Sequence, residues 1–202
     1  MKAVIFDLDG VLVDACEWHR IALNQALKDV ANYEISLTDH YEVFNGIPTR
    51  KKLEILTQKN IIQKSDHEKI YQQKQKNTID IIKNKAKKRQ EKIDLIENLK
   101  KEKYVVACFT NSIRETAFLM LEKTGIKSMF DMIVTNQDVT YPKPNPEGYN
   151  KIVSHFNLNK KYVYIVEDSP KGIQAAEASG CNVIQVKNPD EVSYQNLRKY
   201  IK

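Results

Sequence analysis

The stretch from Met1 to Asp14 reads MKAVIFDLDGVLVD, and it combines a short apolar run with two closely spaced aspartates. Apolar residues that run up to a glycine are typical of a buried β-strand. Residues i and i+2 of a strand share one face, so Asp7 and Asp9 would converge where the chain leaves the sheet. Two carboxylates at that distance repel each other unless a cation or a reaction uses them. The stretch therefore predicts a site at the end of the first strand.

Two other interpretations of this stretch are an EF-hand-like calcium loop and a solvated turn. The calcium pattern requires an acid or Asn near position 11 and a glycine at position 12, where this chain has Val11 and Leu12. The calcium loop is thereby excluded, while the solvated turn stays open on this stretch alone.

The composition is that of a globular protein, with 42% hydrophobic and 29% charged residues in a chain of 202. This length suits one domain, or one core with a smaller inserted unit. No apolar run approaches the ~20 residues of a membrane span, and the acids in residues 1–15 are foreign to a signal peptide. The three cysteines stand far apart and lack metal-ligand spacing. We therefore expect a cytoplasmic protein with reduced, packed cysteines and no membrane partner.

The net charge of +6 is concentrated between Lys83 and Lys92, where six basic residues occur. Such a segment can bind nucleic acid, but it can equally form a solvated helix face, which is the interpretation that we favour. A nucleic-acid-binding module is therefore kept only as a distant alternative.

Two kinds of hydrophobic pattern divide the chain. From residue 15 to about residue 90 the spacing is helical, with an amphipathic helix over 17–31 and a short helix over 36–44 that Ser36 and Asp39 would cap. From Ile93 onward, helices alternate with strands that we expect at 104–109, 132–135, 162–166 and 182–186. This alternation predicts a parallel, doubly wound α/β sheet, interrupted after its first strand by an all-helical segment.

Polar residues stand at the carboxyl ends of three expected strands: Asp7 and Asp9, Thr110 and Asn111, Glu167 and Asp168. Parallel sheets bind ligands at that edge, so these side chains predict one site. Ser112 with Glu115, Asn145 with Pro146, and Ser169 with Pro170 would start the helices that follow, and Gly172 would allow close packing.

Four motifs occur in order along the chain: Asp7-x-Asp9-Gly10-Val11-Leu12-Val13-Asp14, Thr110-Asn111, Lys143-Pro144-x-Pro146 and Glu167-Asp168-Ser169. Together they resemble the haloacid-dehalogenase-like phosphotransferase superfamily, and more narrowly its β-phosphoglucomutase/phosphoglycolate phosphatase branch. The resemblance covers the whole chain. It implies a Rossmann-like α/β core formed by residues 1–14 and 91–202, a helical cap over residues 15–90, and a first strand that lies between the second and the fourth.

The resemblance also implies roles for single residues. Asp7 would be the nucleophile that forms an aspartyl-phosphate, and Asp9 the general acid and base. Mg²⁺ would bind Asp7, the Asp9 carbonyl and Asp168, with Glu167 as a ligand or just behind the ligands. Phosphate or substrate contacts would come from Leu8, Thr110, Asn111, Lys143, His19 and Arg50.

Departures from the mutase pattern favour hydrolysis. The mutase-like cap has an arginine three residues after its loop glycine, but here Thr49 stands at that position and Arg50 lies about 100° further round a helix. Ala15 replaces a hinge threonine, and Arg89-Gln90-Glu91 replaces a hinge Pro-Gly. We therefore expect a monomeric, Mg²⁺-dependent phosphatase of a small phosphorylated metabolite, such as a sugar phosphate or phosphoglycolate. A phosphosugar mutase is the alternative.

Overall fold

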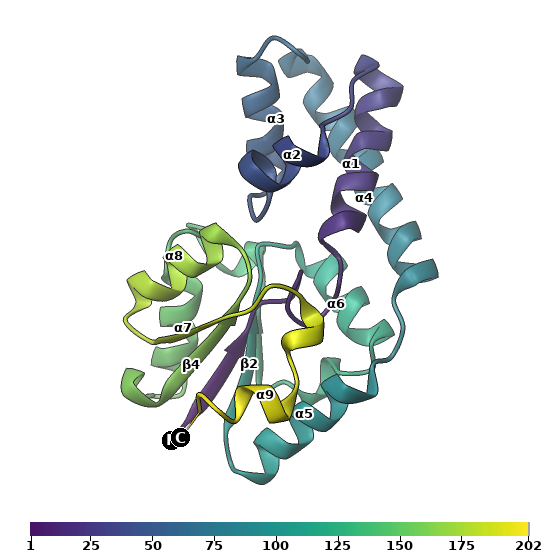
Figure 1. Ribbon diagram of the computed structural model, residues 1–202. Coiled ribbons are helices and arrows are strands. Elements are labelled where there is room, and N and C mark those ends of the chain that lie inside the picture. The colour runs from purple at the N-terminus through teal and green to yellow at the C-terminus, as the bar shows by residue number, and fades with distance from the viewer. Residues whose placement is uncertain (202) are drawn as a thin grey trace. The chain divides into compact units, whose positions relative to one another are not determined.

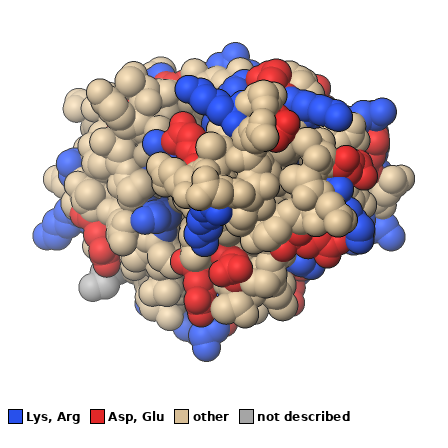
Figure 2. Space-filling model, turned by 90° about the horizontal axis from the view of Figure 1, so that it is seen from above, with Lys and Arg blue, Asp and Glu red and all other residues tan. Residues whose placement is uncertain are grey.

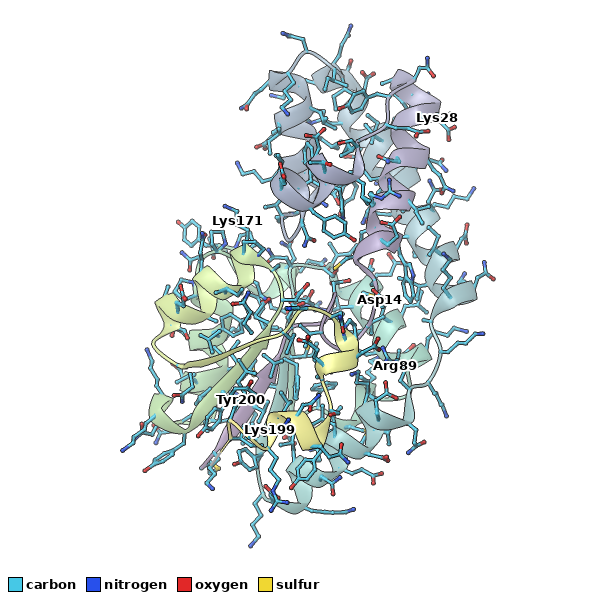
Figure 3. The ribbon with its side chains drawn as sticks, viewed as in Figure 1. Asp14, Lys28, Arg89, Lys171, Lys199 and Tyr200 are labelled. Carbon is cyan, nitrogen blue, oxygen red and sulfur yellow. The ribbon has the colours of Figure 1, made fainter. Side chains whose placement is uncertain are left out.

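The computed structural model describes residues 1–201, which divide into two compact units (Figure 1). The core unit contains Met1–Asp14 and the chain from Lys87 onward, and the helical unit is Ala15–Ala86. The sequence places the second boundary at residue 91, whereas the structure assigns residues 87–90 to the core unit. There Arg89 pairs with Asp190 at 2.5 Å. Asp14 and Arg89, which flank the helical unit in sequence, are both labelled in Figure 3.

The core unit is built on a five-stranded parallel sheet with the order β3-β2-β1-β4-β5. Ala3 of β1 lies opposite Val105 of β2 on one side and Val163 of β4 on the other. The predicted central place of the first strand is therefore confirmed, and its carboxyl end lies in the middle of the sheet edge. The strands are β1 (Ala3–Phe6), β2 (Val105–Phe109), β3 (Met132–Val134), β4 (Val163–Glu167) and β5 (Asn182–Gln185).

Helices cover both faces of this sheet, as right-handed crossovers require (Figure 1). One face carries α7 (Glu147–His155) and α8 (Pro170–Ser179). The other carries α5 (Gln90–Lys101), α6 (Arg114–Lys123) and α9 (Tyr194–Leu197). Burial on both faces explains why the strands read as continuous apolar runs.

The packing under α7 and α8 fixes the strand ends that carry the polar residues. Alternate strand residues such as Ile5, Phe109 and Ile165 point into one buried cluster with Tyr149 and Ile152 of α7. Because these side chains are almost completely buried, the backbone at the sheet edge has little freedom to move.

The helical unit has an apolar core of its own, formed by residues such as Leu23, Phe44 and Leu53. Ser36 accepts a hydrogen bond from the Asp39 backbone N–H, as predicted. The helix expected to continue to Phe44 changes to a π-helix at His40. The elements are α1 (Cys16–Ala31), α2 (Leu37–Asp39), the π-helix His40–Phe44, α3 (Thr49–Gln58) and α4 (His67–Lys85).

Short 3₁₀ turns complete the part of the chain that the structure describes: Lys64–Asp66, Lys127–Met129, Asn136–Asp138, Lys160–Tyr162 and Pro189–Glu191. Among residues 1–201, no helix combines the length and the apolar character needed to cross a membrane.

Candidate active site

Four carboxyl groups and one lysine belong to the segments at the carboxyl edge of the sheet. Asp7 and Asp9 follow β1, Glu167 ends β4 and Asp168 follows it, and Lys143 comes from the segment between β3 and α7. Oxygen atoms of Asp7, Glu167 and Asp168 lie within 4.8 Å of one another. The strand ends thus bring together residues that are more than 100 positions apart in the sequence.

Lys143 is the cation of this cluster, with a side chain that is 3% exposed. Its Nζ donates to Asp7 Oδ1 at 2.5 Å and also to Glu167 Oε1. The rings of Phe109 and Tyr149 lie 4.9 and 5.2 Å from Nζ, within the range of cation–π attraction. Burial acts to lower the pKa of Lys143, but the two carboxylates outweigh it and raise that pKa above its usual value. The ammonium group therefore stays charged.

Asn111 holds the backbone of Lys143 through both atoms of its side-chain amide. Its Oδ1 accepts from the Lys143 N–H at 3.0 Å, and its Nδ2 donates to the Lys143 carbonyl at 3.2 Å. The peptide bond from Lys143 to Pro144 is cis. The predicted phosphate or substrate contact of Asn111 stays a prediction, and the structure shows that its side-chain amide binds the backbone of the lysine loop. Asn111 thereby helps to aim Lys143.

Glu167 is completely buried, and both of its carboxylate oxygens accept hydrogen bonds. Oε1 accepts from Lys143 and from the Tyr149 hydroxyl at 2.8 Å. Oε2 accepts from the backbone N–H of Asp168 at 3.1 Å and of Ser169 at 3.4 Å. With its oxygens held by these donors, Glu167 is suited to positioning Lys143 and less suited to binding a metal.

The first turn of α8 leaves room for this carboxylate. Gly172 lies against Glu167, and a Cβ atom at residue 172 would come within 2.0 Å of the carboxylate. Ser169 caps the helix, because its Oγ accepts from the Gly172 N–H at 3.1 Å. The predicted roles of Ser169 and Gly172 are confirmed. The prediction that α7 starts at Pro146 is wrong by one residue, because the helix starts at Glu147 and Pro146 is its N-cap. The Asn145 side chain still accepts from the Glu147 N–H, at 3.0 Å.

Two hydroxyl groups hold Asp9. Its Oδ2 accepts from Ser112 Oγ at 2.8 Å and from Thr110 Oγ1 at 3.2 Å. The prediction that Ser112 and Glu115 cap the next helix is wrong, because α6 begins at Arg114 with Ile113 as its N-cap, and the Ser112 hydroxyl donates to Asp9. The sequence contained a usable signal, since a second hydroxyl stands two residues after Thr110 at the same strand end.

The cluster carries more negative than positive charge. Burial, followed by the neighbouring Glu167, raises the pKa of Asp168 to about 7. Burial also raises the pKa of Asp7 well above its ordinary value, against the lowering effect of Lys143. Several carboxylate oxygens around one point form the donor set that a hard divalent cation prefers. Asp7 and Asp168 therefore fit Mg²⁺ by the chemistry of their donors.

Leu8 contributes to the turn that carries Asp9. Its side chain is buried, and its carbonyl accepts from the N–H groups of Leu12 and Val13, each at 3.0 Å. Gly10 has a positive φ of 95°, which glycine adopts without strain. A contact between Leu8 and phosphate stays a prediction.

His19 and Arg50 belong to the helical unit. His19 Nδ1 lies 3.3 Å from the Nζ of Lys74. The exposed Arg50 guanidinium contacts Glu68 Oε2 at 3.3 Å and lies 4.3 Å from the centre of the Tyr71 ring. Substrate contacts by His19 and Arg50 stay predictions.

Two of the six basic residues between Lys83 and Lys92 are engaged within the core unit. Lys92 is buried, and its Nζ donates to the carbonyls of Pro189 and Val192, while Arg89 pairs with Asp190. On the face drawn in Figure 2, basic and acidic side chains are interspersed.

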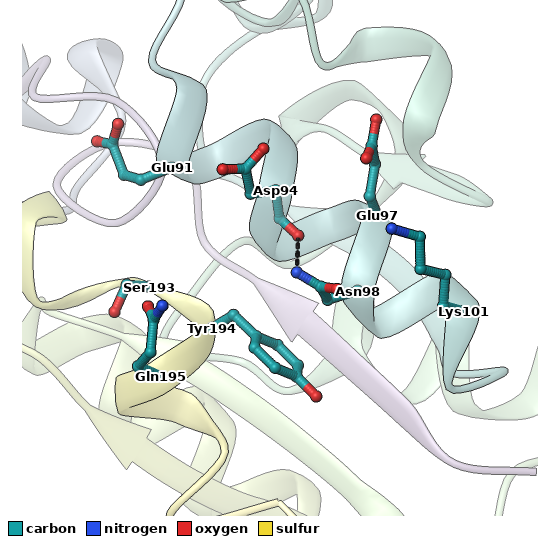
Figure 4. A pocket seen from close by; sticks show the side chains of 8 residues that line it. All are labelled: Glu91, Asp94, Glu97, Asn98, Lys101, Ser193, Tyr194 and Gln195. Atoms are coloured by element: carbon teal, nitrogen blue, oxygen red, sulfur yellow. Dashed lines mark hydrogen bonds between the residues drawn. The ribbon is translucent and has the colours of Figure 1, made fainter.

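A pocket of about 350 Å³ lies between α5 and α9 (Figure 4). Its lining includes Glu91, Asp94 and Glu97 of α5 and Tyr194 of α9. None of the clustered carboxylates or Lys143 lines this pocket, so it is a feature separate from the site described above.

The chain matches the family model for haloacid dehalogenase-like hydrolases over residues 4–186. It is 26% identical over 183 residues to the phosphorylated carbohydrates phosphatase of Thermotoga maritima, a match that covers 89% of this chain and 82% of the relative. It is 26% identical over 197 residues to the phosphoglycolate phosphatase of Haemophilus influenzae, covering 91% and 84%. The crystal structure of β-phosphoglucomutase from Clostridium difficile has a TM-score of 0.84 at 19% identity, covering 98% and 96% of the two chains. At that identity the likeness shows a shared fold alone.

Proposed function

The chain belongs to the haloacid dehalogenase-like hydrolase family, and on this premise we propose that it is a Mg²⁺-dependent phosphatase of a small phosphorylated metabolite. The observation that carries the proposal is the buried contact between Lys143 and Asp7 at the end of the central strand. A fixed ammonium group can bind a phosphate dianion and hold it next to the buried carboxylate. The curated relatives described above are named as phosphatases, which supports the same activity.

Asp7 would act as the nucleophile. Its carboxylate oxygen attacks phosphorus, a bond forms between Asp7 and the phosphoryl group, and the bond from phosphorus to the ester oxygen breaks. Asp9 would give a proton to the departing oxygen and then take a proton from the water that hydrolyses the acyl-phosphate. The hydroxyl groups of Ser112 and Thr110 fix the Asp9 carboxylate for this work.

Lys143 and Thr110 would bind the phosphoryl oxygens during transfer. The Lys143 ammonium offsets charge on the phosphoryl group. The Thr110 hydroxyl, which donates to Asp9 without substrate, would turn its one proton to a phosphoryl oxygen when substrate binds and leave Ser112 to hold Asp9. Asp7, the Asp9 carbonyl and Asp168 would hold Mg²⁺, which supplies charge neutralisation for an incoming dianion when bound. Because Lys143 and Tyr149 already donate to Glu167, we assign Glu167 to positioning Lys143.

We propose that the helical unit serves as the cap and that His19 contributes to substrate binding there. The contacts of Arg50 with Glu68 and Tyr71 within that unit engage its guanidinium group. A surface pair of this kind is weak, but Thr49 stands where the mutase pattern has its phosphate-binding arginine, and a neutral hydroxyl binds a dianion less well than a guanidinium group. This observation supports hydrolysis over the phosphosugar mutase alternative.

The test is a screen of phosphorylated metabolites, including sugar phosphates and phosphoglycolate, for release of inorganic phosphate. We expect release by the purified protein with Mg²⁺ and by the Asp94→Asn control, whose altered carboxylate is exposed on α5. Asp7→Asn should release none, because an amide is a poor nucleophile toward phosphorus.

A second assay separates hydrolase from mutase. β-Glucose 1-phosphate is incubated with and without a sugar bisphosphate, and free phosphate and glucose 6-phosphate are followed together. We expect no stimulation by the bisphosphate. Bisphosphate-stimulated isomerisation with little free phosphate would establish the mutase instead.

A further inference from the structure

We propose that Tyr149 is a positioning residue for the phosphoryl-transfer site, acting through Glu167 on Lys143. This inference rests on the proposed function and extends it to a residue on helix α7. The Tyr149 hydroxyl donates to Glu167 Oε1 at 2.8 Å, and the same oxygen accepts from Lys143. Lys143 in turn donates to Asp7, so a chain of three contacts joins Tyr149 to the nucleophile.

The phenol ring is held rigidly. Tyr149 is completely buried, and its ring packs edge-on against Phe109, with centroids 4.9 Å apart and planes at 88°. The neighbouring Gly148 makes this close approach possible, because a Cβ atom there would lie 2.4 Å from the Phe109 ring. The direction of the hydroxyl group is therefore set by the packing of α7 on the sheet.

The Tyr149 hydroxyl group, unlike its ring, changes how strongly Glu167 attracts Lys143. Glu167 and Asp7 both attract the Lys143 ammonium group. The balance of these two attractions sets the position of the ammonium group relative to a bound phosphate. The phenol offsets part of the charge on Oε1 of Glu167. Without this donor, Oε1 would attract Lys143 more strongly and draw it away from Asp7.

A purely structural role for Tyr149 makes a different prediction. If only the ring mattered, phenylalanine would replace tyrosine without loss, because the contact with Phe109 would persist. Tyr149→Phe therefore removes the hydroxyl while keeping the packing. Tyr162→Phe is the matched control, because the Tyr162 side chain is partly exposed and lies outside the cluster.

The experiment measures kcat and KM for phosphate release by the wild-type protein and the two variants. We expect kcat to fall about 10- to 100-fold in Tyr149→Phe, in line with the loss of outer partners of a site, with KM changed less than about 3-fold. Tyr162→Phe should match the wild type. Because Tyr149 acts through Glu167, adding Tyr149→Phe to Glu167→Gln should cost much less than it costs in the wild type. An unchanged kcat in Tyr149→Phe, or full additivity with Glu167→Gln, would overturn the proposal.

A second readout does not depend on activity. In protein labelled with ¹⁵N-lysine, the buried Lys143 ammonium should give a slowly exchanging Nζ resonance, assigned by its loss in Lys143→Met. This resonance should shift in Tyr149→Phe and stay in place in Tyr162→Phe. If the wild-type protein released no phosphate, the proposed function would fail, and an unshifted resonance would separately refute the contact chain.

Discussion

Replacing Gly172 with alanine places a methyl group where the Glu167 carboxylate lies. A Cβ atom at residue 172 would sit 2.0 Å from the Glu167 carboxyl carbon and Oε1, and 2.1 Å from Oε2. Carbon atoms pack at about 3.5 Å, so the carboxylate or the first turn of α8 must move by about 1.5 Å. Either movement disturbs the groups that hold Lys143.

The expected magnitude follows from two terms. Overpacking a tight interior costs about 1–3 kcal/mol, and losing a hydrogen bond to a charged group costs about 1.5–3 kcal/mol. We therefore expect Gly172→Ala to lower the free energy of unfolding by about 2.5–6 kcal/mol. Displacing Lys143 by about 1 Å should also lower kcat about 100-fold or more.

Urea unfolding and phosphate-release kinetics test this expectation. The matched control is Gly180→Asn, because Gly180 has a φ of +76° that asparagine tolerates, and a Cβ atom there would have its nearest contact at 3.7 Å. The control should lose less than about 1 kcal/mol and keep its activity. Wild-type stability and kcat in Gly172→Ala would refute the account of how Glu167 is held.

Three further predictions concern the metal, the acid and the helical unit. Removing divalent cations with EDTA should abolish phosphate release and added Mg²⁺ should restore it; full activity in metal-free buffer would contradict the metal assignment. Asp9→Asn should lose about 10²–10⁴-fold in kcat, checked by steady-state kinetics, while circular dichroism shows a retained fold. Burial, and then Lys52, lower the pKa of His40 to about 4, so the unfolded chain takes up a proton below about pH 6.5 that the native protein does not. The His40 contribution to stability is therefore full above about pH 6.5 and falls by about 2 kcal/mol toward pH 4.5. Because the raised pKa values of Asp7 and Asp168 act in the opposite direction, urea unfolding should show this loss as a change with pH in the stability difference between the wild type and His40→Phe.

The sheet and the charged cluster were predictable because their signals are local. An apolar strand followed by acids can be recognised at Asp7 and again at Glu167, and the strand–helix alternation predicts that these ends share one edge. A single lysine in a loop has no local signal. Lys143 was predictable only because it stands in a motif that resembles the family pattern. The structure places these residues together as the sequence indicates.

Other features depend on tertiary contacts that no local pattern contains. Tyr149 has the pattern of an ordinary core residue of α7, and only the fold brings its hydroxyl to Glu167. Ser112 has capping-box spacing, yet α6 begins at Arg114, one residue later than a Ser112 cap requires, and the Ser112 hydroxyl donates to Asp9. Lys92 reads as part of a basic surface, but packing buries it against the carbonyls of Pro189 and Val192. In each case a long-range partner outweighs the local preference.

Trapping the covalent intermediate tests the central claim, nucleophilic attack by Asp7, most directly. The Asp9→Asn variant is mixed with ³²P-labelled p-nitrophenyl phosphate, whose leaving group departs without a proton, and the reaction is stopped with acid. The variant should form the acyl-phosphate but hydrolyse it slowly, because it lacks the carboxylate that activates water. We predict a hydroxylamine-sensitive label on the peptide that contains Asp7, and none in Asp7→Asn. A label on another residue would contradict nucleophilic attack by Asp7. The same holds if the wild type releases phosphate while neither the wild type nor Asp9→Asn gives a trapped label.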